Sequence, residues 1–161
     1  MGALIREGPR PGDIGALVRL HGVLYAREYG WDHTYEAYVA KTFAEGMKDF
    51  RPGRDALWVV EDGDAVKGSI AMLGRENGEV QLRWFLIDPS LRGQGLGRKL
   101  MDAALAFGRQ AGYRRCYLLT VAGLDASSHL YGSYGFLRTQ QGPPEKDWGT
   151  TIVPERHELE L

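Results

Sequence analysis

The stretch Leu86-Ile87-Asp88-Pro89-Ser90-Leu91-Arg92-Gly93-Gln94-Gly95-Leu96-Gly97-Arg98 holds the most informative pattern in the chain. It runs from an apolar, strand-like segment through a proline and a glycine-rich loop into a helical segment. The glycines leave backbone N–H groups open at a helix N-terminus, where the helix dipole adds partial positive charge. Arg92, Arg98 and Lys99 supply full charges nearby. These features predict a site for a phosphate or pyrophosphate group.

The common phosphate-binding motifs fit this stretch poorly. A P-loop needs Gly-Lys followed by Ser or Thr, whereas Gly97 is followed by Arg98-Lys99-Leu100. The dinucleotide fingerprint G-x-G-x-x-G is not met by Gly93-x-Gly95-x-Gly97, and the preceding strand ends an antiparallel meander. Nucleoside triphosphates and NAD are therefore disfavoured, and a plain helix-entry turn stays open as the alternative.

Two blocks resemble the GNAT superfamily of acyl-CoA-dependent N-acetyltransferases. Arg92-x-x-Gly95-x-Gly97 matches its R-x-x-G-x-G signature, and Leu130-Tyr131 followed by Gly135-Phe136 matches its L-Y-x-x-x-G-F block. The resemblance implies that the loop binds the CoA pyrophosphate and that Tyr131 protonates the departing thiolate. Tyr131 as an ordinary core tyrosine is the competing interpretation. Many relatives carry Asn seven residues before this tyrosine, but here the residue is Leu124, so no CoA contact is assigned there.

A wider resemblance extends over nearly the whole chain. The segment from His21 to Asp32, the pair Leu82-Arg83 and the pair Leu119-Thr120 are similar to the acetyltransferase half of MarR-type regulator/GNAT fusion proteins. The winged-helix regulator half has no counterpart in residues 1–161, so we expect a single, free-standing acetyltransferase domain over residues 1–161.

Hydrophobic periodicity and turn residues predict the order β-α-α-β-β-β-α-β-α-β-β. Asp13 and either Asp32 or Thr34 are candidate caps for the first two helices. Asp62-Gly63 and Asn77-Gly78 predict tight turns in a meander. The predicted strands are 4–6, 57–61, 65–73, 79–87, 116–121, 136–139 and 152–161. Two helices are predicted to start near 13 and 34, and two more to span 91–111 and 126–134. A loop is predicted at 141–149. The resemblance implies a mixed α/β fold: a central, largely antiparallel sheet of about six to seven strands flanked by about four helices.

The implied activity is transfer of an acetyl group from acetyl-CoA to a primary amine of a small-molecule or amino-acid-like acceptor, directly within a ternary complex. A non-catalytic acyl-CoA-binding sensor of the same fold is the alternative. The resemblance implies that the pantetheine arm pairs with backbone at Leu86 and Ile87. The full set of expected acetyl-CoA-binding residues is Leu86, Ile87, Arg92, Gly93, Gln94, Gly95, Leu96, Gly97 and Arg98.

The general base and the acceptor site are less determined. Glu28 and Glu79 are candidate bases, with a water chain or plain surface charge as alternatives. Tyr25, Tyr29 and Trp31 lie among carboxylates in the first-helix region, a combination suited to a cationic amine, although helix packing explains it too. Arg83 lies within an apolar strand. It is a candidate to bind a substrate carboxylate, but the sequence alone favours an ion pair with an internal Glu.

Composition sets the remaining expectations. The 161 residues are 43% hydrophobic with a net charge of -1, which favours one globular domain and argues against a nucleic-acid partner. The lone Cys116 suits a packed side chain, and the four scattered histidines have no metal-ligand spacing. No signal peptide or membrane span is evident, so we expect a cytoplasmic protein without a membrane partner. Leu159 and Leu161 alternate with charges as in an edge strand, which allows a homodimer.

Overall fold

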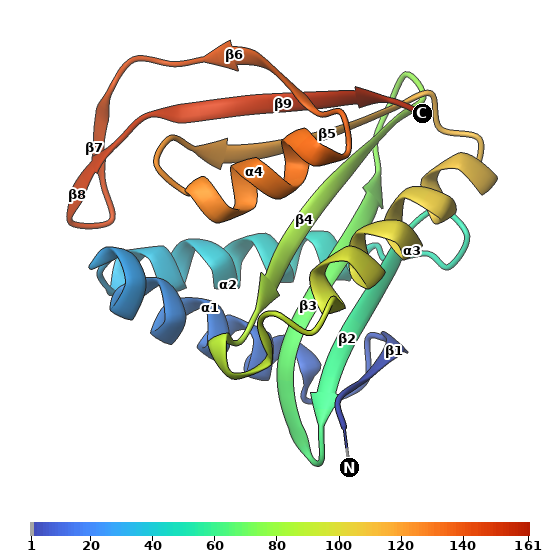
Figure 1. The fold of residues 1–161 in the computed structure, drawn as a ribbon, viewed down its shortest axis with the longest axis horizontal. Coiled ribbons are helices and arrows are strands. Elements are labelled where there is room, and N and C mark those ends of the chain that lie inside the picture. Colours follow the sequence, from blue (N-terminus) through green and yellow to red (C-terminus); the bar gives the residue numbers. More distant parts are fainter. Residues whose placement is uncertain (1) are drawn as a thin grey trace.

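The computed structural model describes residues 2–161 and shows one sheet with helices on both faces (Figure 1). The seven strands of this sheet lie in the order β1-β2-β3-β4-β5-β9-β6, and β7 and β8 form a separate hairpin. This arrangement confirms the predicted fold class. The elements are β1 (Leu4–Gly8), α1 (Asp13–Tyr29), α2 (His33–Lys48), β2 (Ala56–Asp62), β3 (Ala65–Gly74), β4 (Glu79–Ile87), α3 (Leu96–Gln110), β5 (Arg115–Val121), α4 (Asp125–Ser133), β6 (Leu137–Gln141), β7 (Glu145–Asp147), β8 (Thr150–Ile152) and β9 (Pro154–Glu160).

The strands β4 and β5 are the one parallel pair in the described sheet, and they stay together for a short distance only. Glu79, Val80 and Gln81 pair with Arg115, Cys116 and Tyr117, and no pairing follows beyond Gln81. From there the two strands diverge, which Figure 1 shows as an opening that widens away from the C-terminus. The sheet is therefore split into two arms, and residues 82–87 of β4 lack a neighbouring strand on that side.

Side chains alternate between two hydrophobic cores because successive residues of a strand point to opposite faces. On β3, Ile70 and Met72 pack in the core that contains Leu100 and Met101 of α3. Ala71 and Leu73 pack in the other core, with Leu17 of α1 and Phe43 of α2. Cys116 is fully buried in the α3 core, which confirms its prediction as a packed side chain.

The helix caps agree only in part with prediction. Asp32 caps α2, because its carboxylate accepts a hydrogen bond from the Thr34 backbone N–H at 2.9 Å. The prediction that Asp13 caps α1 is wrong: the cap position is Gly12, and no side chain fills it. The Asp13 carboxylate instead forms an ion pair with Arg6 at 2.7 Å, which ties the start of α1 to β1.

Two further boundaries differ from prediction. The long helix begins at Leu96 rather than Leu91, after a single 3₁₀ turn at Pro89–Leu91 and an exposed loop. Leu91 and Leu96 are both buried. The helix was predicted to start too early because the apolar spacing extends through a segment that is not helical. The predicted loop over 141–149 contains β7, which pairs with β8 through Glu145↔Ile152 and two further residue pairs. The last predicted strand is accordingly two strands, β8 and β9.

Candidate active site

A cleft of about 330 Å³ lies on the α1/α2 side of the opening between β4 and β5. Its walls come from α1, α2, β4, β5, α4 and the β7–β8 hairpin, so segments from most of the chain meet there. The residues that line it include His21, Tyr25, Trp31, Tyr35, Tyr38, Thr42, Arg83, Trp84, Phe85, Leu119, Leu124, Tyr131, Glu145, Asp147 and Trp148.

The glycine loop forms an open anion cradle at the start of α3. Gly93 and Gly95 have φ of 78° and 77°, a left-handed conformation that glycine adopts without strain. Nothing lies within 4 Å of a Cβ placed at either position. Gly95 is the cap residue and no side chain accepts from the first turn, so the N–H groups of Leu96, Gly97 and Arg98 are free to bind a ligand. This geometry fits a pyrophosphate.

Arg92 and Glu28 connect this loop to α1. The Arg92 guanidinium lies 2.7 Å from a Glu28 carboxylate oxygen, and both side chains retain solvent contact. Glu28 does not line the cleft. The structure thus places this predicted base beside the expected pyrophosphate site, outside the cleft that Tyr131 lines, where it forms an ion pair with Arg92.

A bulge in β4 shapes the floor of the cleft. Ser69 pairs with Leu86 and Ala71 pairs with Arg83, so β4 holds one residue more than β3 over this interval. Trp84 has a φ of 48°, and its backbone carbonyl accepts a hydrogen bond from the Ser69 hydroxyl at 2.6 Å. Its indole N–H donates to the Thr42 hydroxyl at 3.1 Å, which locks the bulge against α2.

Tyr131 stands between the cleft and the α3 core. It is 7% exposed, and its ring lies 6.1 Å from Phe85 of β4 and 5.8 Å from Phe136. Within residues 2–161, the Tyr131 hydroxyl forms no hydrogen bond. Every fully buried side-chain oxygen there has a hydrogen-bond partner, so the Tyr131 hydroxyl is not fully buried. The hydroxyl therefore opens to the cleft. Burial raises the pKa of this phenol far above its usual value, so it keeps its proton at any working pH.

An aromatic wall forms one side of the cleft; we use this name for Tyr25, Trp31, Tyr35, Tyr38 and Trp148. Trp148 is its centre, with ring centroids 4.6 Å from Trp31 and 4.9 Å from Tyr35. Tyr29 contacts Tyr25 and Trp31 from outside the cleft. The structure thus brings the predicted Tyr25 and Trp31 together with Trp148, a residue that sequence reasoning missed.

The position of Trp148 is held by its turn. Trp148 and Gly149 both have positive φ, 53° and 80°, as in the tight turns that join two strands of a hairpin. The Asp32 N–H donates to the Trp148 carbonyl at 2.9 Å, so the hairpin is attached to the start of α2. Gly149 suits its position in this turn, but Trp148 is not a residue type that predicts a positive φ, so no clear sequence signal predicts the turn.

His21 is a second residue that sequence reasoning did not place in the site. Its Nδ1–H donates to the Leu17 carbonyl at 2.8 Å, which leaves Nε2 as an unprotonated acceptor. Burial lowers the pKa of the imidazole to about 4, against the opposing effect of that hydrogen bond. His21 therefore lines the cleft as a neutral side chain at physiological pH.

Arg83 projects into the cleft from β4. Its Nη2–H donates to the Tyr38 hydroxyl at 3.4 Å, and its guanidinium lies 5.6 Å from the centre of the Trp84 ring. Within residues 2–161 it forms no ion pair with a carboxylate. The favoured prediction of an internal Glu partner is therefore wrong.

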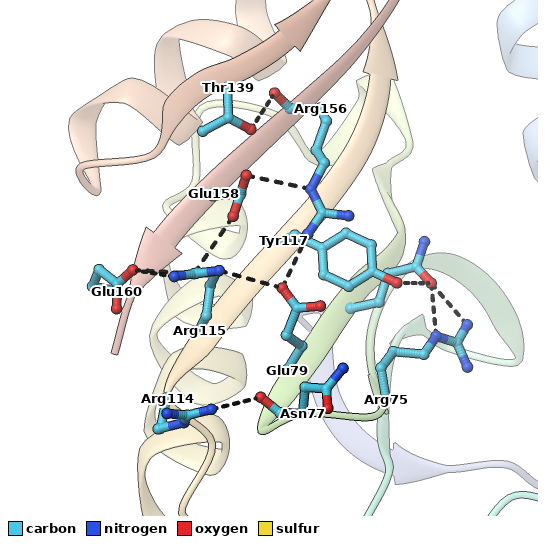
Figure 2. A network of polar contacts seen from close by, with 11 residues as sticks. Arg75, Asn77, Glu79, Arg114, Arg115, Tyr117, Thr139, Arg156, Glu158 and Glu160 are labelled. Atoms are coloured by element: carbon cyan, nitrogen blue, oxygen red, sulfur yellow. Dashed lines mark hydrogen bonds and ion pairs between the residues drawn. The ribbon is translucent and has the colours of Figure 1, made fainter.

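Glu79 lies at the opposite end of β4, in the ion-pair network of Figure 2. Its carboxylate is 3.0 Å from Arg156 of β9 and 3.8 Å from Arg115 of β5. Arg156 also stacks over Tyr117, 3.9 Å from the ring centre. Glu79 does not line the cleft, and the structure does not bring it together with Tyr131.

The comparison with protein families identifies the chain. The family model described as "Acetyltransferase (GNAT) family" matches residues 22–136, most of the chain. The chain belongs to this family. The match includes the glycine loop and Tyr131. Within residues 2–161 there is no cluster of metal-ligating side chains and no helix long and apolar enough to cross a membrane.

Individual relatives add detail. The chain is 42% identical over 89 residues to the uncharacterized N-acetyltransferase YjgM of Escherichia coli strain K12, an alignment that covers 53% of each protein. The chain spans about half the length of the curated relatives that it matches. The resemblance to the acetyltransferase half of regulator fusions stays a prediction.

Two solved structures agree in fold. A GNAT acetyltransferase from Staphylococcus aureus Mu50 has a TM-score of 0.77 at 15% identity, with 99% of both chains covered. A GNAT acetyltransferase from Elizabethkingia anophelis, crystallised with acetyl-CoA bound, has a TM-score of 0.68 at 13% identity, covering 99% of this chain and 98% of that one. At these identities the likeness bears on the fold.

Proposed function

We propose that this GNAT-family chain transfers the acetyl group of acetyl-CoA to the primary amine of a small molecule. One observation carries the proposal: the opening between β4 and β5 has an uncapped glycine cradle at one side and the free Tyr131 hydroxyl at the other. A pyrophosphate in the cradle leaves the unpaired edge of β4 for an extended pantetheine arm. The thioester would then lie beside Tyr131.

The residues of the chain divide the work of this reaction. The N–H groups of Leu96, Gly97 and Arg98 bind the pyrophosphate, and the charge of Arg92 adds to them. Backbone groups at Leu86 and Ile87, on the unpaired side of β4, hold the pantetheine arm. The amine nitrogen forms a bond to the carbonyl carbon, the carbon–sulfur bond breaks, the nitrogen loses one proton, and Tyr131 donates one proton to the thiolate.

The proton released by the amine needs an acceptor within the cleft. Neither Glu28 nor Glu79 lines it, whereas the neutral His21 does and the carboxylates of Glu145 and Asp147 stand at its exposed rim. We therefore propose that the proton leaves through water in the cleft, with the unprotonated His21 Nε2 as a proton acceptor along its wall.

The experiment is a thiol-release assay with purified protein, acetyl-CoA and a panel of amines, amino acids, aminoglycosides and peptides, against a blank without acceptor. Acetyl-CoA binding is measured in parallel by calorimetry. Thiol release with an acceptor class, together with binding, supports the proposal. Binding without release for any acceptor contradicts it and favours a non-catalytic acyl-CoA sensor.

A further inference from the structure

The unpaired charge of Arg83 is the feature of the cleft that acetyl transfer alone does not explain. Three arginines near the other end of β4 have acidic or amide partners: Arg156 and Arg115 contact Glu79, and Arg75 contacts Gln81. Arg83 is half-buried; its guanidinium donates to Tyr38, lies over the Trp84 ring and has no carboxylate partner within residues 2–161. A guanidinium is costly to withdraw from water unless a partner arrives, and its planar fork matches a carboxylate.

The surroundings of Arg83 favour a ligand with an apolar body. Tyr38, which accepts the Arg83 hydrogen bond, lies 5.5 Å from Trp148 in the aromatic wall. The floor beside it includes Leu119, which is 59% exposed. An apolar side chain placed between the aromatic wall and Leu119 would remove both surfaces from water.

Arg83 lies close along β4 to the residue that packs against Tyr131. Arg83 is two residues before Phe85, and the ring of Phe85 is 6.1 Å from that of Tyr131. Both Arg83 and Tyr131 line one cleft of about 330 Å³, which is at the small end of ligand sites. An acceptor that reaches both must be short.

The rim adds the opposite charge. Glu145 and Asp147 lie on the β7–β8 hairpin at the cleft entrance, exposed and without an ion pair among residues 2–161. Their field attracts an ammonium group, whereas Arg83 inside repels a second one. The charges suit a molecule with one amine and one carboxylate better than a polyamine.

Resting on the proposed acetyl transfer, we infer that the acceptor is a free α-amino acid with an apolar or aromatic side chain. Arg83 binds its carboxylate, and the aromatic wall packs against its side chain. The amine is then directed to the thioester beside Tyr131. Polyamines and aminoglycosides are excluded by the Arg83 charge.

Matched acceptors test the inference. Phenylalanine, phenylalaninamide and phenethylamine share ring and amine, but only phenylalanine has the carboxylate. We expect wild-type kcat/KM to be about 10–100-fold higher for phenylalanine, the usual effect of a charge-assisted contact. Arg83→Gln should remove this preference by losing activity toward phenylalanine alone, and Arg83→Lys should restore part of it. Arg114→Gln, at the far end of the sheet, is the control.

A binding measurement separates this inference from the proposed function. Trp31, Trp84 and Trp148 line the cleft, so their emission should change when phenylalanine binds the protein–CoA complex, without any turnover. Binding of phenylalanine that weakens in Arg83→Gln supports the inference even where no thiol is released. Equal affinity or equal kcat/KM for phenylalanine and phenethylamine, or an unaltered Arg83→Gln variant, overturns it and leaves acetyl transfer standing.

Discussion

At one end β4 pairs with β5 through Glu79, Val80 and Gln81, whereas from Leu82 onward it has no partner on that side. At the paired end Glu79 lies between two arginines, Arg115 and Arg156, and forms ion pairs with both (Figure 2). At the open end the charge of Arg83 is unmatched and aromatic rings surround it.

The difference shows how one strand serves two purposes. Ion pairs and ladder hydrogen bonds stabilise the paired end. The open end lacks those partners, and the groups left unsatisfied there are the ones that a substrate can satisfy. The presence or absence of a partner for a charged side chain therefore indicates the reactive site better than residue type does.

The largest effect is expected at the open end, from Tyr131→Phe. Loss of the hydroxyl should lower kcat about 10²–10⁴-fold, the usual contribution of a general acid, with acetyl-CoA affinity unchanged. Tyr134→Phe is the matched control, because the Tyr134 hydroxyl donates to Asp102 outside the cleft. An unchanged kcat in Tyr131→Phe would assign that residue to the core alone.

A pH titration should show that the open end keeps His21 neutral. The folded pKa is about 4, below the 6.5 of an unfolded histidine. The unfolded chain therefore binds the proton first as pH falls. The neutral imidazole contributes its full stability above about pH 6.5. As it titrates in the unfolded chain, the free energy of unfolding falls by about 2 kcal/mol by pH 5 and about 3 kcal/mol by pH 4.

Urea unfolding between pH 7 and pH 4 measures this loss, and His21→Gln isolates it from the titration of the carboxylates. The wild-type protein should lose more stability than the variant over that range. Parallel curves for the two proteins would show that His21 is protonated as readily in the folded state as in the unfolded chain.

Gly95→Ala tests the anion cradle. A Cβ at a φ of 77° costs about 1–2 kcal/mol of stability and covers the N–H groups that face the ligand. We expect acetyl-CoA to bind about tenfold more weakly, equivalent to about 1.4 kcal/mol. Gly112→Ala, at the other end of α3 with a φ of 87° and open space around it, controls for the strain. Equal acetyl-CoA affinities in the two variants would exclude the cradle.

The smallest effect is expected at the paired end. Glu79→Gln should lower the free energy of unfolding by about 1 kcal/mol, as for other partly exposed ion pairs. The kcat and the pH–rate profile should stay unchanged, because Glu79 does not line the cleft. A rate loss that grows toward low pH would instead identify Glu79 as a base. Glu28→Gln, measured alongside, should alter acetyl-CoA binding through Arg92 rather than the profile.

The sequence predicted most of the fold because local signals and tertiary structure agree over β2, β3 and β4. Asp62-Gly63 and Asn77-Gly78 lie at tight turns, with φ of 62° at Gly63 and 59° at Asn77. The hairpin of β7 and β8 was missed because Glu145, Lys146 and Asp147 are all exposed, so no alternation of apolar residues indicates a strand. Contact between Trp148 and the helices stabilises it instead.

The candidate site was predictable where the motif itself forms the structure, as in the glycine loop. It was not predictable where distant segments decide a side chain's surroundings. Whether Arg83 has an acidic partner depends on strand register and on the bulge at Trp84, and neither follows from the residues around Arg83. His21 was equally hidden, because its exposure to the cleft depends on how α1 packs.

The bulge in β4 also constrains how this chain can change over evolution. Arg83 and Leu86 are three residues apart, yet they face the same side, because their partners Ala71 and Ser69 are two apart on β3. Insertion of one more residue between them would turn every earlier position of β4 to the opposite face, exchanging core and cleft side chains, whereas loss of one residue would remove the bulge and leave both on the same side. Descendants of this gene should therefore vary the length of the 75–78 turn long before that of the strand it precedes.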